Sequence, residues 1–338
     1  MKLFETKIED EDIDVISEVL KSGNIGFGEN VSKFENEFTS YSNKEYNIAT
    51  NSASAAAYII FAYLKERYGS CDVYTPSLAF TSPAWAAKHF GHNIIWIEVD
   101  DNLLFDVEHY KKERRLRCER YSDCGVRPVL MPILYGGVST ISGFDKIKDD
   151  GYNETVVVDS AHCVTPTIDS DFIFFSFHPY KPIAASDGGM ISTDDFEASE
   201  FFQAYRNFGR KNKNGTYDIT MDGFKFYMNN LNATIALTQL KKYKEKLLGR
   251  KEVHKMLENI NFDGRLLPHD TNSSYYFATL ICNDNSLESL LEQFPTSKHY
   301  PLLHLTDYYK DGTELPNTEK IHKYILNLQL YEKNIYNS

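Results

Sequence analysis

Residues 172–189 read FIFFSFHPYKPIAASDGG, an aromatic and aliphatic run that leads directly into a proline-flanked lysine. Such a continuous apolar run is typical of a strand that is buried on both faces, as in parallel sheets covered by helices. Pro179 and Pro182 restrict the backbone on either side of Lys181. A lone loop lysine is usually just an exposed side chain, but this rigid setting at a strand end makes Lys181 a candidate for chemistry.

Other short apolar runs surround this stretch and alternate with helical patterns along the first half of the chain. They lie at residues 46–50, 72–76, 93–100, 127–134, 155–161 and 188–193. Strands that alternate with helices favour a mostly parallel sheet between two helical layers, which is the α/β class. The sequence therefore predicts a large α/β domain built around the FIFFSF strand.

Two helices are expected before the first strand. The first covers residues 12–20 and turns Ile13, Ile16 and Leu20 to one face, whereas the second repeats apolar residues at three- and four-residue spacing over 31–41. These amphipathic patterns predict surface helices rather than fully buried ones.

The second half of the chain changes pattern. Residues 207–222 are polar and contain glycine, which predicts a loop, and a long helix is expected over 229–260. A strand within 273–282 and a helix over 286–294 predict a small α+β unit. Together these patterns predict two domains.

The predicted boundary divides a large domain, residues 1–235, from a small C-terminal domain, residues 236–338. The opening helix has the freedom to pack on the small domain. A chain of 338 residues suits one large domain with a smaller companion.

Composition excludes several classes of protein. The chain carries 36 Lys and Arg against 48 Asp and Glu, a net charge of -12, which argues against a nucleic-acid-binding protein. The acidic N-terminus lacks the apolar stretch of a signal peptide, and the longest apolar run is about half of the ~20 residues that span a bilayer. We therefore expect a cytoplasmic protein with no membrane partner. The five cysteines lack metal-ligand spacing, so we expect reduced thiols and no metal site.

Polar residues at strand ends are the candidates for a site, because ligands of open α/β sheets bind there. Asp159 ends one strand, Ser176 ends the FIFFS strand, and Lys181 follows it. The tract NSASAAA at 51–57 lies where a strand passes into a helix, and backbone N–H groups there could bind a phosphate. Phe80 follows another strand.

This set matches the needs of pyridoxal phosphate. The cofactor needs a lysine for covalent attachment, a carboxylate for its pyridine nitrogen, an aromatic ring against its face and a phosphate cradle. Each residue also has a plainer explanation: Asp159 as a helix cap, Ser176 as a small core residue, Phe80 as core and the tract as a capped helix. It is their combination that favours the cofactor.

A series of ordered motifs resembles the DegT/DnrJ/EryC1/StrS family of sugar aminotransferases from about residue 8 to residue 330. The motifs are GNIGFGENVSKFENEF at 23–38, NSASAA at 51–56, TPSLAFTS at 75–82, VVVDSAH at 156–162, SFHPYKPIAASDGG at 176–189, GFKFYMNNLNATIALTQL at 223–240 and HYPLLH at 299–304. The resemblance implies the aspartate-aminotransferase fold (pyridoxal-phosphate fold type I), with a mostly parallel seven-stranded sheet.

The resemblance also implies roles for individual residues. Lys181 would attach the cofactor, Asp159 would pair with its ring nitrogen and Phe80 would stack on the ring. The phosphate would lie at Ser176, Ala53 and Ser54.

Three positions depart from the family pattern. His162 stands where the family usually has glutamine, and it could still bond the ring oxygen. Lys225 stands where an asparagine from the second subunit usually meets the phosphate, and Tyr227 replaces a nearby arginine. A cofactor ligand contributed by the partner implies a homodimer with shared active sites.

The implied reaction transfers the amino group of L-glutamate, through pyridoxamine phosphate, to a keto carbon of a nucleotide-linked sugar. SFHPYKP is most similar to the branch that acts at C4 of 4-keto-6-deoxyhexoses. The alternatives are a 3-keto sugar aminotransferase, a pyridoxal-phosphate-dependent sugar dehydratase, and a non-catalytic sugar-binding or regulatory homologue. The dehydratase branch has histidine in place of the lysine, so Lys181 argues against it.

Further residues are candidates for substrate contact. Arg206, Arg210 and Lys211 are expected to meet the diphosphate of the nucleotide sugar, and His178 is either a substrate contact or a support for its loop. The basic run KKERRLRCER at 111–120 is more typical of a solvated helix face than of a phosphate site.

Overall fold

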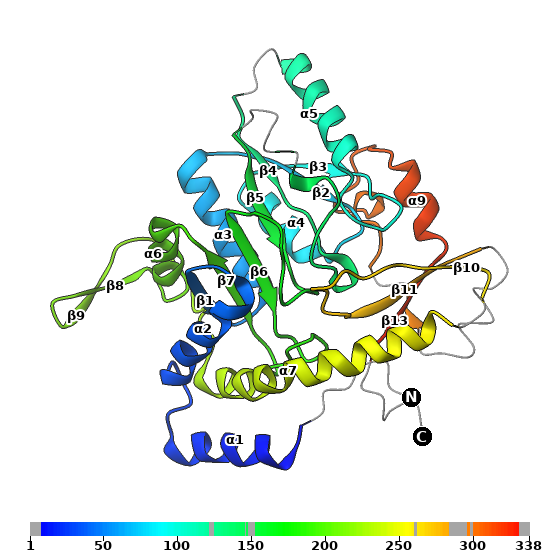
Figure 1. The fold of residues 1–338 in the computed structure, drawn as a ribbon. Helices are drawn as coiled ribbons and strands as arrows, with labels where there is room; N and C mark the ends of the chain where they lie inside the picture. Colours follow the sequence, from blue (N-terminus) through cyan, green and yellow to red (C-terminus); the bar gives the residue numbers. More distant parts are fainter. Residues whose placement is uncertain are drawn as a thin grey trace.

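A computed structural model of the chain describes residues 8–121, 125–145, 147, 153–259, 262–283, 296–297 and 300–330. Its centre is a seven-stranded sheet with the order β1-β7-β6-β5-β4-β2-β3 (Figure 1). The strands are β1 (Tyr46–Thr50), β2 (Asp72–Pro76), β3 (Asn93–Ile97), β4 (Pro128–Leu130), β5 (Thr155–Asp159), β6 (Phe172–Ser176) and β7 (Gly189–Thr193). Only β7 runs antiparallel to its neighbours, β1 and β6. The predicted mostly parallel α/β sheet is confirmed.

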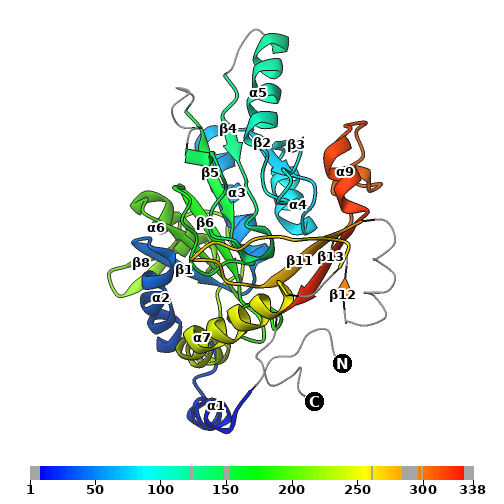
Figure 2. The same cartoon turned by 45° about the vertical axis from the view of Figure 1, so that its right-hand side comes forward.

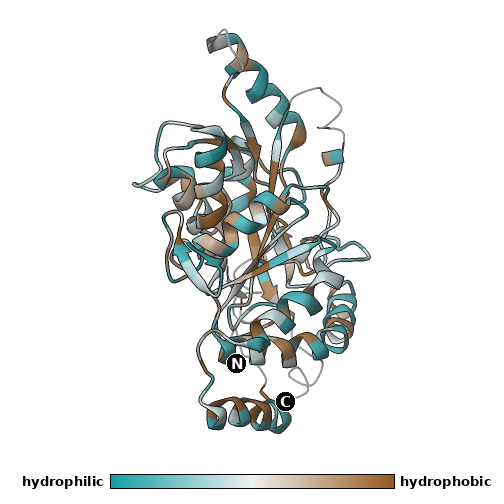
Figure 3. Cartoon of the chain, turned by 90° about the vertical axis from the view of Figure 1, so that its left-hand side faces the viewer, coloured by the Kyte–Doolittle hydropathy of each residue, from teal (hydrophilic) through white to brown (hydrophobic). Residues whose placement is uncertain are grey.

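Both faces of this sheet are buried, which explains the unbroken apolar runs. Phe172 and Phe174 pack with α3 (Ala53–Tyr68), α4 (Thr81–His89) and α6 (Phe196–Tyr205) on one face. Ile173 and Phe175 alternate with them and pack with α2 (Glu29–Ser42) and α7 (Asn230–Leu257) on the other. Figure 3 shows the hydrophobic residues concentrated on the strands in the middle of the molecule.

A second, antiparallel sheet follows α7 in the sequence, with the order β10-β11-β13-β12. Its strands are β10 (Gly264–Leu266), β11 (Phe277–Cys282), β12 (Thr296–Ser297) and β13 (Ile325–Gln329), and α9 (Pro316–His322) precedes β13. Helix α7 runs from the large sheet to beneath this small sheet (Figure 2). The predicted boundary after residue 235 falls within α7, and the predicted helix over 286–294 lies outside the described residues.

The first helix, α1 (Asp10–Ser22), packs on α7 through charge rather than through its apolar face. Lys242 of α7 bonds Glu9 at 2.6 Å and Asp12 at 3.0 Å, and Asp12 is buried. Ile13 and Leu20, by contrast, are about half exposed. The amphipathic pattern correctly predicted a helix, but in this chain its apolar side faces solvent.

The expected polar loop at 207–222 is wrong, because this segment forms a hairpin of β8 (Arg210–Lys213) and β9 (Thr216–Ile219). The hairpin pairs with no other strand among the described residues, and all of β9 is exposed. Its strands therefore lack the alternation that a half-buried strand shows. Asn214 and Gly215 both have positive φ, as a two-residue hairpin turn requires.

Helix α5 (Val107–Tyr121) carries the basic run, and it is only partly the solvated helix predicted. Arg114 is buried, and Arg117 forms a salt bridge with the buried Asp72 of β2. Leu116 of the same run is 44% exposed, in line with a solvated face. Arg114 and Arg117 thus pack between the helix and the sheet instead of facing water.

The cysteines follow the prediction in part. Cys71, Cys163 and Cys282 are buried free thiols, whereas Cys118 is disulfide-bonded. An odd number of cysteines therefore did not exclude a single bonded pair. Within the described ranges, no three His, Cys, Asp or Glu side chains cluster as a metal site, and no helix combines the length and apolar composition needed to cross a membrane.

Candidate active site

The lysine loop, residues 177–188, connects β6 to β7 and is closed by backbone hydrogen bonds. Phe177 N–H donates to the Gly188 carbonyl and Ala185 N–H donates to the Phe177 carbonyl, both at 2.8 Å. Within it, Lys181 N–H donates to the His178 carbonyl at 2.8 Å. Because both flanking strands lie inside the large sheet, the loop holds the lysine in a fixed place.

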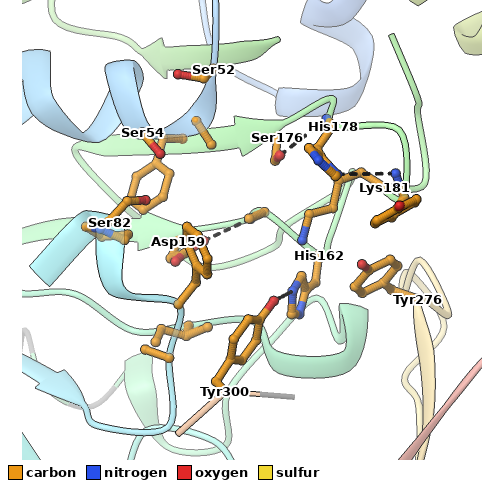
Figure 4. Close-up of a pocket in the computed structure, with 18 of the residues that line it drawn as sticks. Ser52, Ser54, Ser82, Asp159, His162, Ser176, His178, Lys181, Tyr276 and Tyr300 are labelled. Carbon is orange, nitrogen blue, oxygen red and sulfur yellow. Dashed lines mark hydrogen bonds between the residues drawn. The ribbon is translucent and has the colours of Figure 1, made fainter. Parts of the chain in front are cut away.

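A cavity of about 450 Å³ lies at the carboxyl ends of the strands. The predicted residues that line it are Ala53, Ser54, Phe80, Asp159, His162, Ser176, His178 and Lys181. Figure 4 shows Lys181, Asp159 and His162 in this cavity, together with Tyr276 and Tyr300. Residues from four separate segments thus meet as the strand-end argument predicted.

Burial and mutual attraction set the charges of the central pair. Burial raises the pKa of Asp159 to about 6, although the Ala161 N–H and the Lys181 ammonium both act to lower it. Burial also lowers the pKa of Lys181 to about 8, against the opposing effect of Asp159. The lysine can therefore exchange a proton near neutral pH, as a general acid and base must.

The N-terminus of α3 forms one wall of the cavity. The Ser52 hydroxyl accepts a hydrogen bond from Ala55 N–H, and the Ser52 carbonyl accepts one from Ala56 N–H. These bonds satisfy the N–H groups of the third and fourth residues of the helix. The N–H groups of Ala53 and Ser54 are then left for a ligand, at the end of the helix that favours an anion. Gly189 lies against this turn: a β-carbon there would come within 2.5 Å of the Ser52 carbonyl carbon.

Two tyrosines of the cavity were not predicted. Tyr300 bonds His162 through its hydroxyl and the imidazole Nε2 at 3.2 Å, and it meets Phe80 edge to face. The ring of Tyr276 lies 4.5 Å from the His162 ring and 4.7 Å from Lys181 Nζ. Both follow α7 in the sequence, outside the strands of the large sheet, so the strand-end argument does not apply to them. Only the HYPLLH motif gave a signal, and only for Tyr300.

The remaining predicted residues lie outside this cavity. Arg206 is buried, where its guanidinium pairs with Glu35 and donates to the Ala49 carbonyl, so it is not placed to meet a diphosphate. The sequence could not reveal that distant carboxylate. The guanidinium of Arg210 lies over the Tyr217 ring of the hairpin.

Two lysines of the hairpin region also lie away from the cavity of their own chain. Lys211 is half-buried on β8. Lys225 is exposed, and its backbone forms an isolated antiparallel β-bridge with that of Asn207.

The cavity fits pyridoxal phosphate. It offers one amine, one buried carboxylate, the exposed ring of Phe80 and a helix N-terminus whose approach to β7 only glycine permits. Lys181 would attach the cofactor, Asp159 would face its ring nitrogen, and Ser176 with the α3 N-terminus would hold its phosphate.

Comparison with known proteins agrees with this geometry. The model of the DegT/DnrJ/EryC1/StrS aminotransferase family matches residues 6–334. The chain is 26% identical to the spore coat polysaccharide biosynthesis protein SpsC of Bacillus subtilis, over 95% of this chain and 90% of that one.

Solved structures share the fold. Helicobacter pylori PseC, an aminotransferase involved in the biosynthesis of pseudoaminic acid, matches with a TM-score of 0.85 at 19% identity, covering 98% of this chain and 93% of that one. Streptococcus pneumoniae Spr1654 in its PLP form matches with a TM-score of 0.82 at 22% identity, covering 98% and 94%.

Proposed function

Because the chain belongs to the DegT/DnrJ/EryC1/StrS aminotransferase family, we propose that it transfers the amino group of L-glutamate to a nucleotide-linked keto sugar, using pyridoxal phosphate. The observation that carries the proposal is the placement of Lys181, Asp159 and the α3 N-terminus around one cavity. The proposed acceptor is C4 of a 4-keto-6-deoxyhexose.

The side chains divide the work among themselves. The bound cofactor supplies an electron sink at the carbon that gains or loses the amino group. Lys181 anchors the cofactor and, when detached, carries the proton to and from the reacting carbons. Asp159 keeps the ring nitrogen protonated, and Phe80 covers the ring.

The sugar assignment is supported by two relatives and one motif. SpsC is described in polysaccharide biosynthesis and PseC in pseudoaminic acid biosynthesis, so a sugar acceptor suits the family members that this chain resembles. The sequence SFHPYKP favours the 4-keto branch. His178 lines the cavity and is the proposed contact to the sugar within the same chain.

The proposed enzyme is a cytoplasmic homodimer. Lys225 is exposed and lies outside its own cavity, so it would reach the cofactor phosphate of the partner subunit. The shared site predicts that a monomeric variant loses activity. An active monomer would remove Lys225 from the proposal.

The decisive experiment offers the purified protein UDP-, dTDP- and GDP-linked 3-keto and 4-keto sugars with glutamate. Mass spectrometry should detect an amino sugar together with 2-oxoglutarate, and only with the 4-keto sugars. Release of water without 2-oxoglutarate would indicate a dehydratase. Amination of the 3-keto sugars alone would instead move the acceptor carbon to C3.

A separate test addresses the non-catalytic alternative. Borohydride reduction of the protein loaded with pyridoxal phosphate should fix the cofactor on Lys181. A protein that leaves Lys181 unmodified would be a binder rather than an aminotransferase.

A further inference from the structure

Tyr276 presents its ring to the amine of Lys181, with 4.7 Å between Nζ and the ring centroid. A lysine ammonium within about 6 Å of an aromatic face is attracted by the negative charge of that face. The two residues come from different sheets, because Lys181 follows β6 and Tyr276 precedes β11. Figure 4 shows both side chains on the same side of the cavity.

The segment that carries Tyr276 is tied by hydrogen bonds to the connections that follow β4 and β5. Ser274 N–H donates to the Gly137 carbonyl at 2.7 Å, and Tyr276 N–H donates to the Gly136 carbonyl at 3.0 Å. The Ser274 hydroxyl accepts from Val164 N–H at 2.7 Å. The ring therefore lies where its backbone is fixed, independently of any bound cofactor.

Gly137 makes this close approach possible. It has a φ of +94°, and a β-carbon there would lie 2.9 Å from Tyr276 N and 3.1 Å from Tyr276 Cβ. Only glycine meets both conditions without displacing the segment. The ring also contacts the rings of His162 and Phe277, at 4.5 Å and 4.2 Å between centroids.

We propose that Tyr276 is a positioning residue for Lys181, whose ring face keeps the detached amine inside the cavity and favours its ammonium form. The inference rests on the proposed function, in which Lys181 carries a proton when it is not bound to the cofactor. Burial disfavours the charged amine, and Asp159 is the carboxylate that offsets this. The ring adds attraction at a second point, so that the amine is held between Asp159 and Tyr276.

Other titratable groups also line the cavity and can influence the measured pKa of Lys181. They are Tyr135, His162, Tyr180, His178, Asp187 and Tyr300. Burial lowers the pKa of His178, and the positive charge of Lys181 lowers it further. Substitutions at position 276 remove none of these groups. Because the Tyr276 ring also contacts His162, a change in the Lys181 pKa is assigned to the ring face only by comparing two aromatic rings of similar size at this position.

The test measures the pKa of Lys181 in the cofactor-free protein. Acetic anhydride acylates only the neutral amine, so peptide mass spectrometry of the Lys181 peptide across about pH 6 to 10 yields its pKa. Tyr276→Leu should lower that pKa by about one unit, because the attraction for the ammonium is lost. Tyr276→Phe keeps the ring and should leave the pKa close to that of the wild type.

A fluorinated ring separates attraction from packing. A trifluorinated phenylalanine at position 276 keeps nearly the size of phenylalanine but weakens the negative face, so the pKa of Lys181 should fall relative to Tyr276→Phe. This comparison also holds if Tyr276→Leu fails to fold. Equal pKa values for the two rings would overturn the proposal.

Tyr275→Leu is the matched control on the same segment, because Tyr275 stacks on His269 and does not line the cavity. It should leave the pKa of Lys181 unchanged. An equal fall in Tyr275→Leu and Tyr276→Leu would show that the segment acts only by its packing, and would also overturn the proposal. None of these readouts needs amino transfer, so failure of the proposed function would appear separately, as absent attachment of the cofactor.

Discussion

The lysine loop and the β8–β9 hairpin both present basic side chains, yet only the loop delivers one to the cavity. The loop is closed by hydrogen bonds between two strands inside the large sheet, which fixes Lys181. The hairpin pairs only with itself in the described part of the chain, and its second strand is exposed throughout. The position of a basic side chain next to the central sheet is fixed by contacts within one chain. The position and role of a basic side chain on the exposed hairpin depend on the molecule that packs against the hairpin.

Lys181→Ala tests the loop side of this comparison and should have the largest effect. Amino transfer should fall by about 10³-fold or more, because both covalent attachment and proton transfer are lost. The absorbance of the attached cofactor should disappear while circular dichroism stays native. Lys213→Ala, on the exposed hairpin tip where Lys213 pairs with Asp218, is the matched control.

Wild-type activity in Lys181→Ala would contradict the whole assignment of the cavity. The lysine loop would then not supply the reactive amine, and its fixed place in the sheet would have no catalytic consequence.

The same contrast explains what the sequence could predict. Asp159, Ser176 and Lys181 follow buried strands, and the order of such strands places their ends together, so their meeting in one cavity was predictable. Tyr276 was not, because its position depends on Gly136 and Gly137, far away in the sequence. No periodic pattern records such a contact.

Two segments were misread for different reasons. The hairpin was taken for a loop because both of its faces meet solvent, although the Asn-Gly pair at its turn was a usable signal. Arg206 was taken for a substrate ligand because the sequence does not show that Glu35 neutralises it. The turn signal of the hairpin was overlooked, whereas the role of Arg206 depends on a partner that is distant in the sequence.

Asp159→Asn should change how stability depends on pH. The folded-state pKa of Asp159, about 6, lies above the ordinary value of 3.8 for this carboxyl group, so the folded protein binds the extra proton and loses stability as pH rises through this window. In cofactor-free Asp159→Asn the decline should be shallower by up to about 1.4 kcal/mol per pH unit. Urea unfolding of dilute protein between about pH 4 and 6 measures it.

Asp218→Asn on the hairpin controls for the loss of one negative charge. If wild type and Asp159→Asn share the same slope, the carboxylate is not held in the raised state that the buried cavity implies.

Gly189→Ala tests the phosphate cradle behind the lysine loop. The new β-carbon would lie 2.5 Å from the Ser52 carbonyl carbon, so the first turn of α3 must move away from β7. The dissociation constant for pyridoxal phosphate should rise about tenfold, which corresponds to about 1.4 kcal/mol of lost binding. Titration of the cofactor-free protein by absorbance measures this change.

Gly26→Ala is the matched control for the cradle, because a β-carbon there meets nothing within 4 Å. Unchanged cofactor affinity in Gly189→Ala would show that the phosphate does not lie at the start of α3.

Lys211→Glu tests the hairpin side, and its expected effect is the smallest. If the hairpin reaches the diphosphate of a nucleotide sugar in the assembled enzyme, KM for the sugar should rise a few-fold, about 3- to 10-fold, with little change in kcat. The increase should shrink as salt is added, because exposed charges are screened over about 10 Å at 0.1 M ionic strength. Lys213→Glu, two residues along the same strand, removes a lysine that already pairs with Asp218 and should leave KM unchanged. If KM stays constant in both variants, the hairpin does not contact the nucleotide sugar and has a structural role alone. The loop and the hairpin would then differ in function as well as in geometry, because only the loop would supply a basic side chain to the reaction.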